Sequence, residues 1–145
     1  MKINDKIYCK DVGVYSGQLT KRKSYIIEEI NAEDVRIWND EARLRWYSKL
    51  YFQTDKEPEI ISIHIDDTIE NSESDAIEVT IEFSNKDKYW LTFTTPKYLD
   101  KILNEESYFF SRDFIIIKSL NEESIKSTIQ KLDEKNELIE NCKKY

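Results

Sequence analysis

Carboxylates are the most concentrated reactive groups in this sequence. Six lie between residues 66 and 78 with no lysine or arginine among them: Asp66, Asp67, Glu70, Glu73, Asp75 and Glu78. Such a cluster could hold a cation, but it lacks the glycine and the alternating oxygen ligands of a calcium loop. It could also be a plain solvated loop. A third reading is that the loop mimics phosphates and occupies the cationic cleft of a basic enzyme.

Other residues that could do chemistry have no partners at a useful spacing. His64 is the only histidine, and no nucleophile elbow supports a Ser-His-Asp arrangement around it. Two glycines cannot form a phosphate-binding loop. No cysteine and histidine cluster has zinc spacing, and no two acids stand out as a glycosidase pair. We therefore predict no catalytic residues, no metal and no cofactor.

Basic and aromatic residues interleave densely only in residues 43–52. In a structural reading, Trp46, Leu50 and Phe52 fill a small barrel, because such barrels need their aromatic side chains inside. In a functional reading, the stretch contributes to a stacking platform for a single-stranded nucleic acid or a peptide. The residues that would form this alternative binding face are Arg36, Trp38, Arg43, Arg45 and Tyr47.

Short alternating segments before residue 53 predict strands at 6–10, 24–30, 35–38 and 42–47, with an irregular loop at 11–20. This order of strand, long loop, strand, hairpin and aromatic-rich turn resembles a Src-homology-3-like barrel. The segment from Leu44 to Phe52 resembles the last strand and closing turn of bacterial and phage versions. We therefore expect a small β-barrel over residues 1–52, followed by a connector at 53–58.

Residues 59–145 show a different pattern, which predicts the order βββ-α-β-α-α. The patterned segments are strands at 61–65, 77–83 and 89–94, a helix from Pro96 to about Asn104, a strand at 114–117, and a final helical region divided near 133–136. The fold class is thus β-rich α+β, with helices covering one face of an antiparallel sheet. The other face is polar and holds Trp90. It is a solvated face, the surface against which the barrel docks, or a protein-binding surface with Trp90 as anchor.

Charge is divided unevenly along the chain, whose net charge is −7. Residues 1–57 hold 11 basic and 10 acidic groups, whereas residues 58–145 hold 11 basic and 19 acidic groups, a net charge of −8. Because an acidic surface repels phosphate, nucleic acid is an unfavourable partner for the second part. The same charge would steer a basic protein toward it.

The two cysteines, Cys9 and Cys142, are distant in sequence and have no Cys-x-x-Cys spacing. Unpaired thiols of this kind suit a reducing compartment, and we expect them to be structural. No apolar run approaches the roughly 20 residues that span a bilayer. We therefore expect a cytoplasmic protein with no membrane contact. The sequence does not predict its oligomeric state.

The small acidic layout, a β-meander ending in helices, resembles bacterial immunity-type proteins that neutralise toxins. The pattern Trp-x-Thr-Phe-x-Thr-Pro, from Trp90 to Pro96, also resembles segments of uncharacterised bacterial proteins. The first resemblance implies a non-enzymatic interaction protein that binds a basic partner, such as a toxin. The residues expected to bind that partner are Asp66, Asp67, Glu70, Glu73, Asp75 and Trp90.

Overall fold

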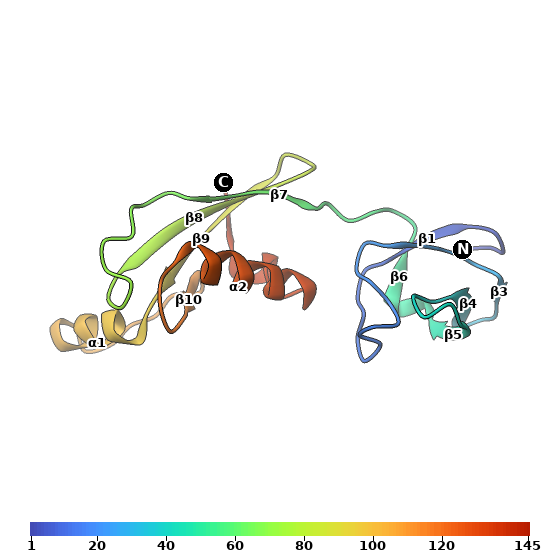
Figure 1. Cartoon of the computed structure of the whole chain (residues 1–145), viewed down its shortest axis with the longest axis horizontal. Helices are drawn as coiled ribbons and strands as arrows, with labels where there is room; N and C mark the ends of the chain where they lie inside the picture. The colour runs from blue at the N-terminus through green and yellow to red at the C-terminus, as the bar shows by residue number, and fades with distance from the viewer. The chain divides into compact units, whose positions relative to one another are not determined.

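The computed structural model describes residues 1–145, and the chain is a mixed α+β protein, as predicted (Figure 1). It divides into two compact units, Met1–Glu57 and Pro58–Tyr145. Each unit has its own cluster of buried hydrophobic side chains. No helix combines the length and the apolar character that a membrane crossing would require.

The first unit contains six short strands and one 3₁₀ turn. These are β1 (Lys6–Cys9), β2 (Ser24–Ile26), β3 (Glu29–Ile30), β4 (Asp34–Trp38), β5 (Leu44–Ser48), η1 (Lys49–Tyr51) and β6 (Phe52–Gln53). They form two antiparallel three-stranded sheets, in the orders β2-β1-β6 and β3-β4-β5. No strand ladder joins the two sheets, so the predicted closed barrel is not found. Gln53, assigned by the sequence to a connector, is part of β6.

The core of the first unit differs from the prediction by one residue of register. Trp46 is 43% exposed, whereas its neighbour Tyr47 is only 2% exposed. Because Val35 pairs with Tyr47 across β4 and β5, Tyr47 lies on the inner face and Trp46 on the outer one. Leu50, also predicted inside, is exposed in η1. Only Phe52 of the three predicted core residues is buried.

The predicted irregular loop of residues 11–20 packs onto this core. The Tyr15 ring makes edge contacts with the rings of Tyr47 and Tyr51, at centroid distances of 4.9 and 5.4 Å. Gly13 has a φ of +49°, and a Cβ there would lie 2.5 Å from the Tyr51 ring. The loop therefore requires glycine at this position, both for its backbone and for the space.

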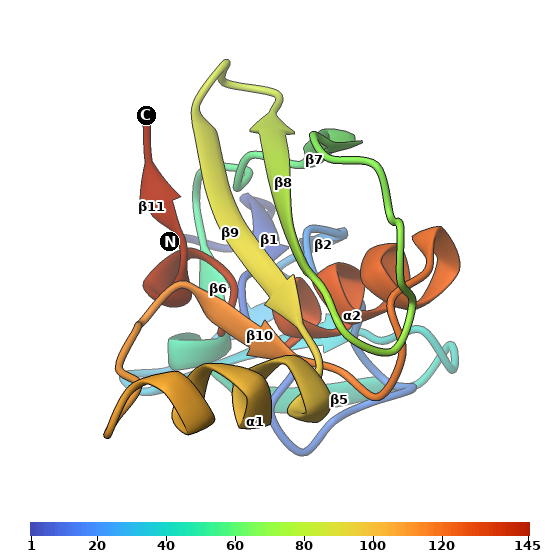
Figure 2. The same ribbon diagram turned by 90° about the vertical axis from the view of Figure 1, so that its left-hand side faces the viewer.

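The second unit contains one five-stranded sheet and two α-helices. Its elements are β7 (Ile60–Ile65), β8 (Ala76–Phe83), β9 (Lys88–Thr94), α1 (Pro96–Glu105), β10 (Phe114–Ile116), α2 (Glu122–Glu134), the 3₁₀ turn η2 (Ile139–Asn141) and β11 (Lys143–Lys144). The strands β7, β8 and β9 form the predicted antiparallel meander. Beside the other edge of β9 lie β10, which is parallel to it, and β11, which is antiparallel (Figure 2).

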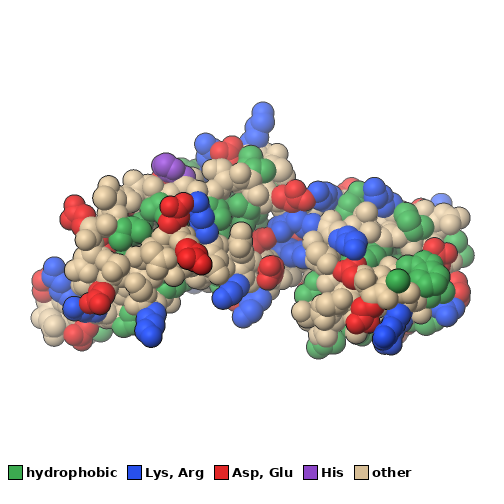
Figure 3. Space-filling view, viewed as in Figure 1, with side chains coloured by type: hydrophobic (Ala, Val, Ile, Leu, Met, Phe, Trp, Pro, Cys, Tyr) green, Lys and Arg blue, Asp and Glu red, His purple; other side chains and the backbone are tan.

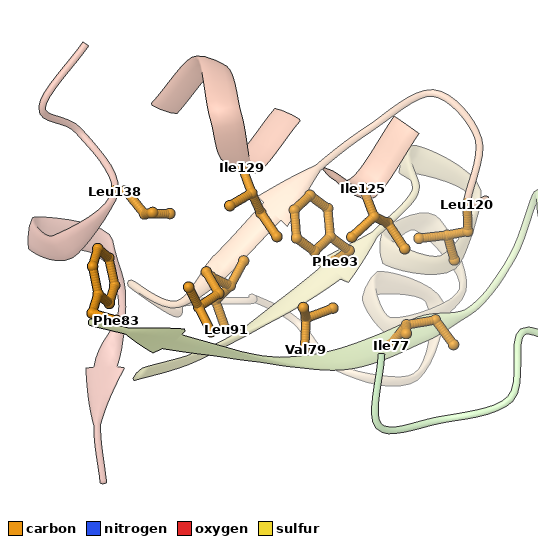
Figure 4. Packing of buried hydrophobic residues seen from close by; sticks show 10 residues of the cluster. Ile77, Val79, Phe83, Leu91, Phe93, Leu120, Ile125, Ile129 and Leu138 are labelled. Carbon is orange, nitrogen blue, oxygen red and sulfur yellow. The ribbon is translucent and has the colours of Figure 1, made fainter. Parts of the chain in front are cut away.

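The inner face of this sheet packs on α2 (Figure 4). Alternate residues of β8 and β9 point toward α2 and the segments beside it. The buried residues of this core are Ile77, Val79, Ile81, Phe83, Leu91, Phe93, Leu120, Ile125, Ile129 and Leu138. The alternation predicted for β8 and β9 is thus confirmed. In β7 a register shift between Ile60 and Ser62 leaves Ile61 exposed, although the prediction placed it with Ile63.

The structure confirms the predicted start of the first helix and corrects the prediction for the C-terminal region. Thr95 caps α1 and Pro96 is its first residue, as predicted. The cap of α2 is Asn121. The prediction of a second terminal helix is wrong, because that region forms only the turn η2 followed by β11. The predicted strand at 114–117 is β10, in which Ile116 is exposed because it lies on the face opposite α2.

Candidate functional site

The face of the sheet opposite α2, called the outer face below, contains a shallow groove of about 510 Å³. It is lined by residues of the strands and of the loops beside them, among them Asp67, Glu78, Trp90, Thr92, Asp113 and Lys143. The β8–β9 register explains its floor, since Glu78 pairs with Thr92 and Thr80 pairs with Trp90. Trp90 is half-buried there, so one part of its ring remains accessible.

Hydrogen bonds from β8 hold two of the predicted acids at the edge of this groove. Asp67 Oδ2 accepts a hydrogen bond from the backbone N–H of Glu78 at 2.9 Å. Asp66 Oδ2 accepts from Thr80 Oγ1 at 2.7 Å, and His64 Nε2 is 3.6 Å from Asp66 Oδ1. The structure therefore holds Asp66 and Asp67 beside β8, the strand that pairs with the Trp90 strand β9.

The remaining predicted acids do not line the groove. The carbonyl of Glu73 accepts from Thr95 Oγ1, and the carbonyl of Asp75 accepts from Thr94 Oγ1. These bonds fix the end of the loop at the junction of β9 and α1. Glu70 is exposed and its carboxylate has no partner in the structure. The six acids thus form two groups rather than one patch.

Most of these carboxylates are not neutralised by the chain's own cations. Among the five carboxylates predicted to bind the partner, only Glu73 lies near a lysine, with Oε2 3.5 Å from Lys97 Nζ. Both side chains of that pair are largely exposed, so the pair contributes little stability. On the molecular face seen in Figure 3, acidic and basic side chains are interspersed. On that face the acidic side chains therefore do not form a continuous patch.

Sequence reasoning missed Asp113 and Lys143, which meet in the groove. The Asp113 side chain is 4% exposed, and its Oδ2 lies 3.1 Å from Lys143 Nζ. Burial acts to raise the pKa of Asp113, but hydrogen bonds from Ser111 and Lys143 outweigh it and hold the pKa below its usual value. Lys143 Nζ also lies 4.6 Å from the centroid of the Trp90 ring. The only sequence signal was an acid directly before the apolar run 114–117.

The two thiols are unpaired and poorly reactive. Burial raises the pKa of Cys9 to about 11. Burial, together with the charge of Asp113, raises the pKa of Cys142 to about 12. Since the thiolate is the reactive form, neither cysteine is an activated nucleophile at neutral pH.

The alternative face in the first unit is only partly assembled. Tyr47 is buried, its hydroxyl bonded to Asn39 and Gln18, so it cannot stack on a ligand. Arg36 and Trp38 do lie on the exposed outer face of β4, and the Arg36 guanidinium is 5.9 Å from the Trp46 ring centroid. Trp46 thus takes the place that the sequence assigned to Tyr47.

Arg43 and Arg45, the other cations predicted for this face, are both exposed. Arg43 Nη1 lies 3.5 Å from Glu41 Oε2 in the β4–β5 turn. Arg45 is opposite Ile37, one position along the ladder from the Arg36–Trp46 pair, so it is on the other face of the sheet from Arg36. The predicted five residues are therefore not one platform.

No three histidine, cysteine, aspartate or glutamate side chains in the chain are arranged to hold a metal ion. No protein-family model, curated protein or solved structure matches the chain.

Proposed function

We propose that this chain is a non-enzymatic interaction protein whose second unit binds a basic protein. The binding surface would comprise the groove around Trp90 together with the acids at its edge. The observation that supports this most is that Asp66 and Asp67 are hydrogen-bonded to β8, the strand beside the half-buried Trp90 of β9, and have no lysine or arginine partner. An immunity protein that neutralises a basic toxin in the cytoplasm is the specific form we favour.

Physical reasons support such a surface. Partly accessible tryptophans are common anchors of protein interfaces, because they bury a large area in one side chain. Carboxylates around the anchor would attract a cationic partner and accelerate the encounter. With a net charge of −8 on residues 58–145, this attraction should weaken as salt is added.

The test begins with capture of a partner from the native host by the wild-type chain. Its association rate is then measured with Glu70→Lys/Glu78→Lys, which alters two exposed side chains that make no bonds to the fold. We expect association to slow by about tenfold and to lose most of its salt dependence. The matched control is Glu105→Lys/Glu134→Lys, exposed acids at the ends of α1 and α2. An association rate that is the same in variant and wild type would contradict the proposal.

A second variant separates charge from loop structure. Asp66→Asn/Asp67→Asn removes two charges but keeps the oxygen atoms that accept from Thr80 and Glu78. We expect slower association with an unchanged melting temperature. A large loss of stability would instead assign these acids to the fold alone.

We infer a second candidate function for the first unit, as an open relative of the Src-homology-3-like barrels that binds a peptide or a single-stranded nucleic acid. The exposed rings of Trp38 and Trp46 on the outer face of β4 and β5, with the half-buried Arg36 between them, favour it. A fluorescence-anisotropy titration with single-stranded oligonucleotides and proline-rich peptides tests it. Binding lost on Trp38→Ala would support it, and no binding at low salt would dispose of it.

A further inference from the structure

The strand β11 places two lysines against β9, each between a carboxylate and an aromatic ring. Lys143 Nζ lies 3.1 Å from Asp113 and 4.6 Å from the centroid of Trp90. Lys144 Nζ lies 2.9 Å from Asp87 and 5.7 Å from the centroid of Tyr89. A basic, extended segment of the chain therefore lies along β9, and its Lys143 forms one side of the Trp90 groove.

The backbone of this segment completes the edge of the sheet. Along β9, β10 pairs with residues 92–94, whereas β11 pairs with Trp90 and Tyr89. The backbone N–H of Tyr145 donates to the carbonyl of Lys88 at 3.1 Å, and the Tyr145 hydroxyl lies 3.1 Å from Thr80 Oγ1. Without β11, this part of β9 would be an open strand edge, which readily pairs with another extended chain.

The strand β11 is attached to β9 by only two residue pairs. The strand has two residues, and both lysine side chains are 55% exposed. The pair of Lys144 with Asp87 lies at the surface and contributes little free energy, and a short edge strand opens easily. The pair of Lys143 with the buried Asp113 is the stronger attachment, because opening leaves Asp113 without its cation until another lysine replaces it. The segment 143–145 can therefore leave β9 without unfolding the core, which is formed by other elements.

We propose that residues 143–145 are an internal substitute for the partner, and that the partner adds an extended, lysine-bearing segment to the same edge of β9. The partner's lysines would take the positions of Lys143 and Lys144, and its backbone would replace β11 by strand addition. This inference rests on the proposed function, since it assumes that the outer face binds a basic protein. The inference adds how the partner's backbone would bind. It also adds that residues 143–145 compete with the partner and lower the apparent affinity of the chain for it.

The test uses a fluorescent peptide, Asn-Ser-Lys-Lys-Tyr, which reproduces residues 141–145 with serine in place of Cys142. Its binding is measured with the full chain and with Lys143→Glu/Lys144→Glu, in which the internal segment is repelled from Asp113 and Asp87. Because the closed segment blocks the site for most of the time, we expect the variant to bind the peptide at least about tenfold more tightly. A peptide with both lysines replaced by glutamate should not bind.

The matched control is Lys101→Glu/Lys118→Glu, which changes the net charge equally at exposed positions outside β11. If the control and the Lys143→Glu/Lys144→Glu variant bound the peptide with equal affinity, the effect would be one of overall charge and the inference would be overturned. Failure of the Lys143→Glu/Lys144→Glu variant to bind the peptide would also overturn it.

A second measurement needs no substitution. Excess peptide added to the wild-type chain should remove the exchange protection of the Tyr145 amide, whose hydrogen bond to Lys88 would be replaced. Unchanged protection at saturating peptide would overturn the inference.

The two proposals fail in different ways. If no form of the chain binds the peptide but Glu70→Lys/Glu78→Lys still slows the captured partner, only the internal substitute is wrong. If the peptide displaces β11 but the charge reversal leaves partner association unchanged, the acidic edge is wrong.

Discussion

Adjacent residues have opposite roles at the β4–β5 hairpin, and stability measurements can separate them. Tyr47 fills the first core and its hydroxyl is bonded to Asn39 and Gln18, whereas Trp46 is on the exposed face. We expect Tyr47→Ala to cost about 3–5 kcal/mol, as truncations of large core residues do. Trp46→Ala should cost less than about 1 kcal/mol. Urea unfolding followed by circular dichroism measures both, and the reverse order would restore Trp46 to the core.

Asp113 makes the stability of the second unit depend on pH. Its pKa in the folded protein lies below the value of about 3.9 for an unfolded aspartate. The carboxylate therefore contributes stability above pH 3.9, and this contribution is lost as the pH falls through the folded pKa. We expect Asp113→Asn to be less stable than wild type at neutral pH, with a difference that shrinks in acid. Melting temperatures across that range measure it, and a difference independent of pH would contradict it.

At the scale of elements, the sequence predicts best where local signals are sufficient. The strict alternation of residues 77–83 and 89–94 identifies β8 and β9, and the Thr95-Pro96 pair identifies the start of α1. The register of β4 on β5 was missed, because inner and outer faces both carry large aromatic and basic side chains. The pairing of β11 with β9 was missed because a two-residue strand shows no periodicity. Its partner strand also lies more than 50 residues earlier in the chain, so no local signal indicates the contact.

The candidate site shows the same division. The sequence predicted the acids and Trp90, since composition and alternation are local. It did not predict that Asp67 and Glu78 line the groove while the other four acids do not, or that Asp113 and Lys143 complete it. These positions follow from the parallel pairing of β10 with β9, which no single segment encodes.

The cap of α2 provides a prediction at this scale. Asn121 Oδ1 accepts from the backbone N–H of Ser124 at 2.8 Å, which satisfies a free amide at the helix start. We expect Asn121→Ala to destabilise the second unit by about 1 kcal/mol. The control Asn104→Ala, on the exposed surface of α1, should be neutral or slightly stabilising. Equal effects of the two substitutions in urea unfolding would show that the cap is unimportant.

At the scale of the whole molecule, the two hydrophobic cores share no residues. Phe93→Ala, in the second core, should therefore destabilise residues 58–145 by about 3–5 kcal/mol and leave protection in residues 1–57 unchanged. Hydrogen exchange resolved along the chain measures both units in one experiment. A loss of protection that spreads equally over the first unit would contradict independent cores.

The central claim is that the outer face of the second unit is the binding surface. The most direct measurement is the set of amide NMR shifts of the full chain when the captured partner is added. We predict that the largest changes fall on Asp66, Asp67, Trp90 and residues 143–145, with β11 losing its pairing to β9. Shift changes confined to Arg36, Trp38 and Trp46 in the first unit would contradict the claim.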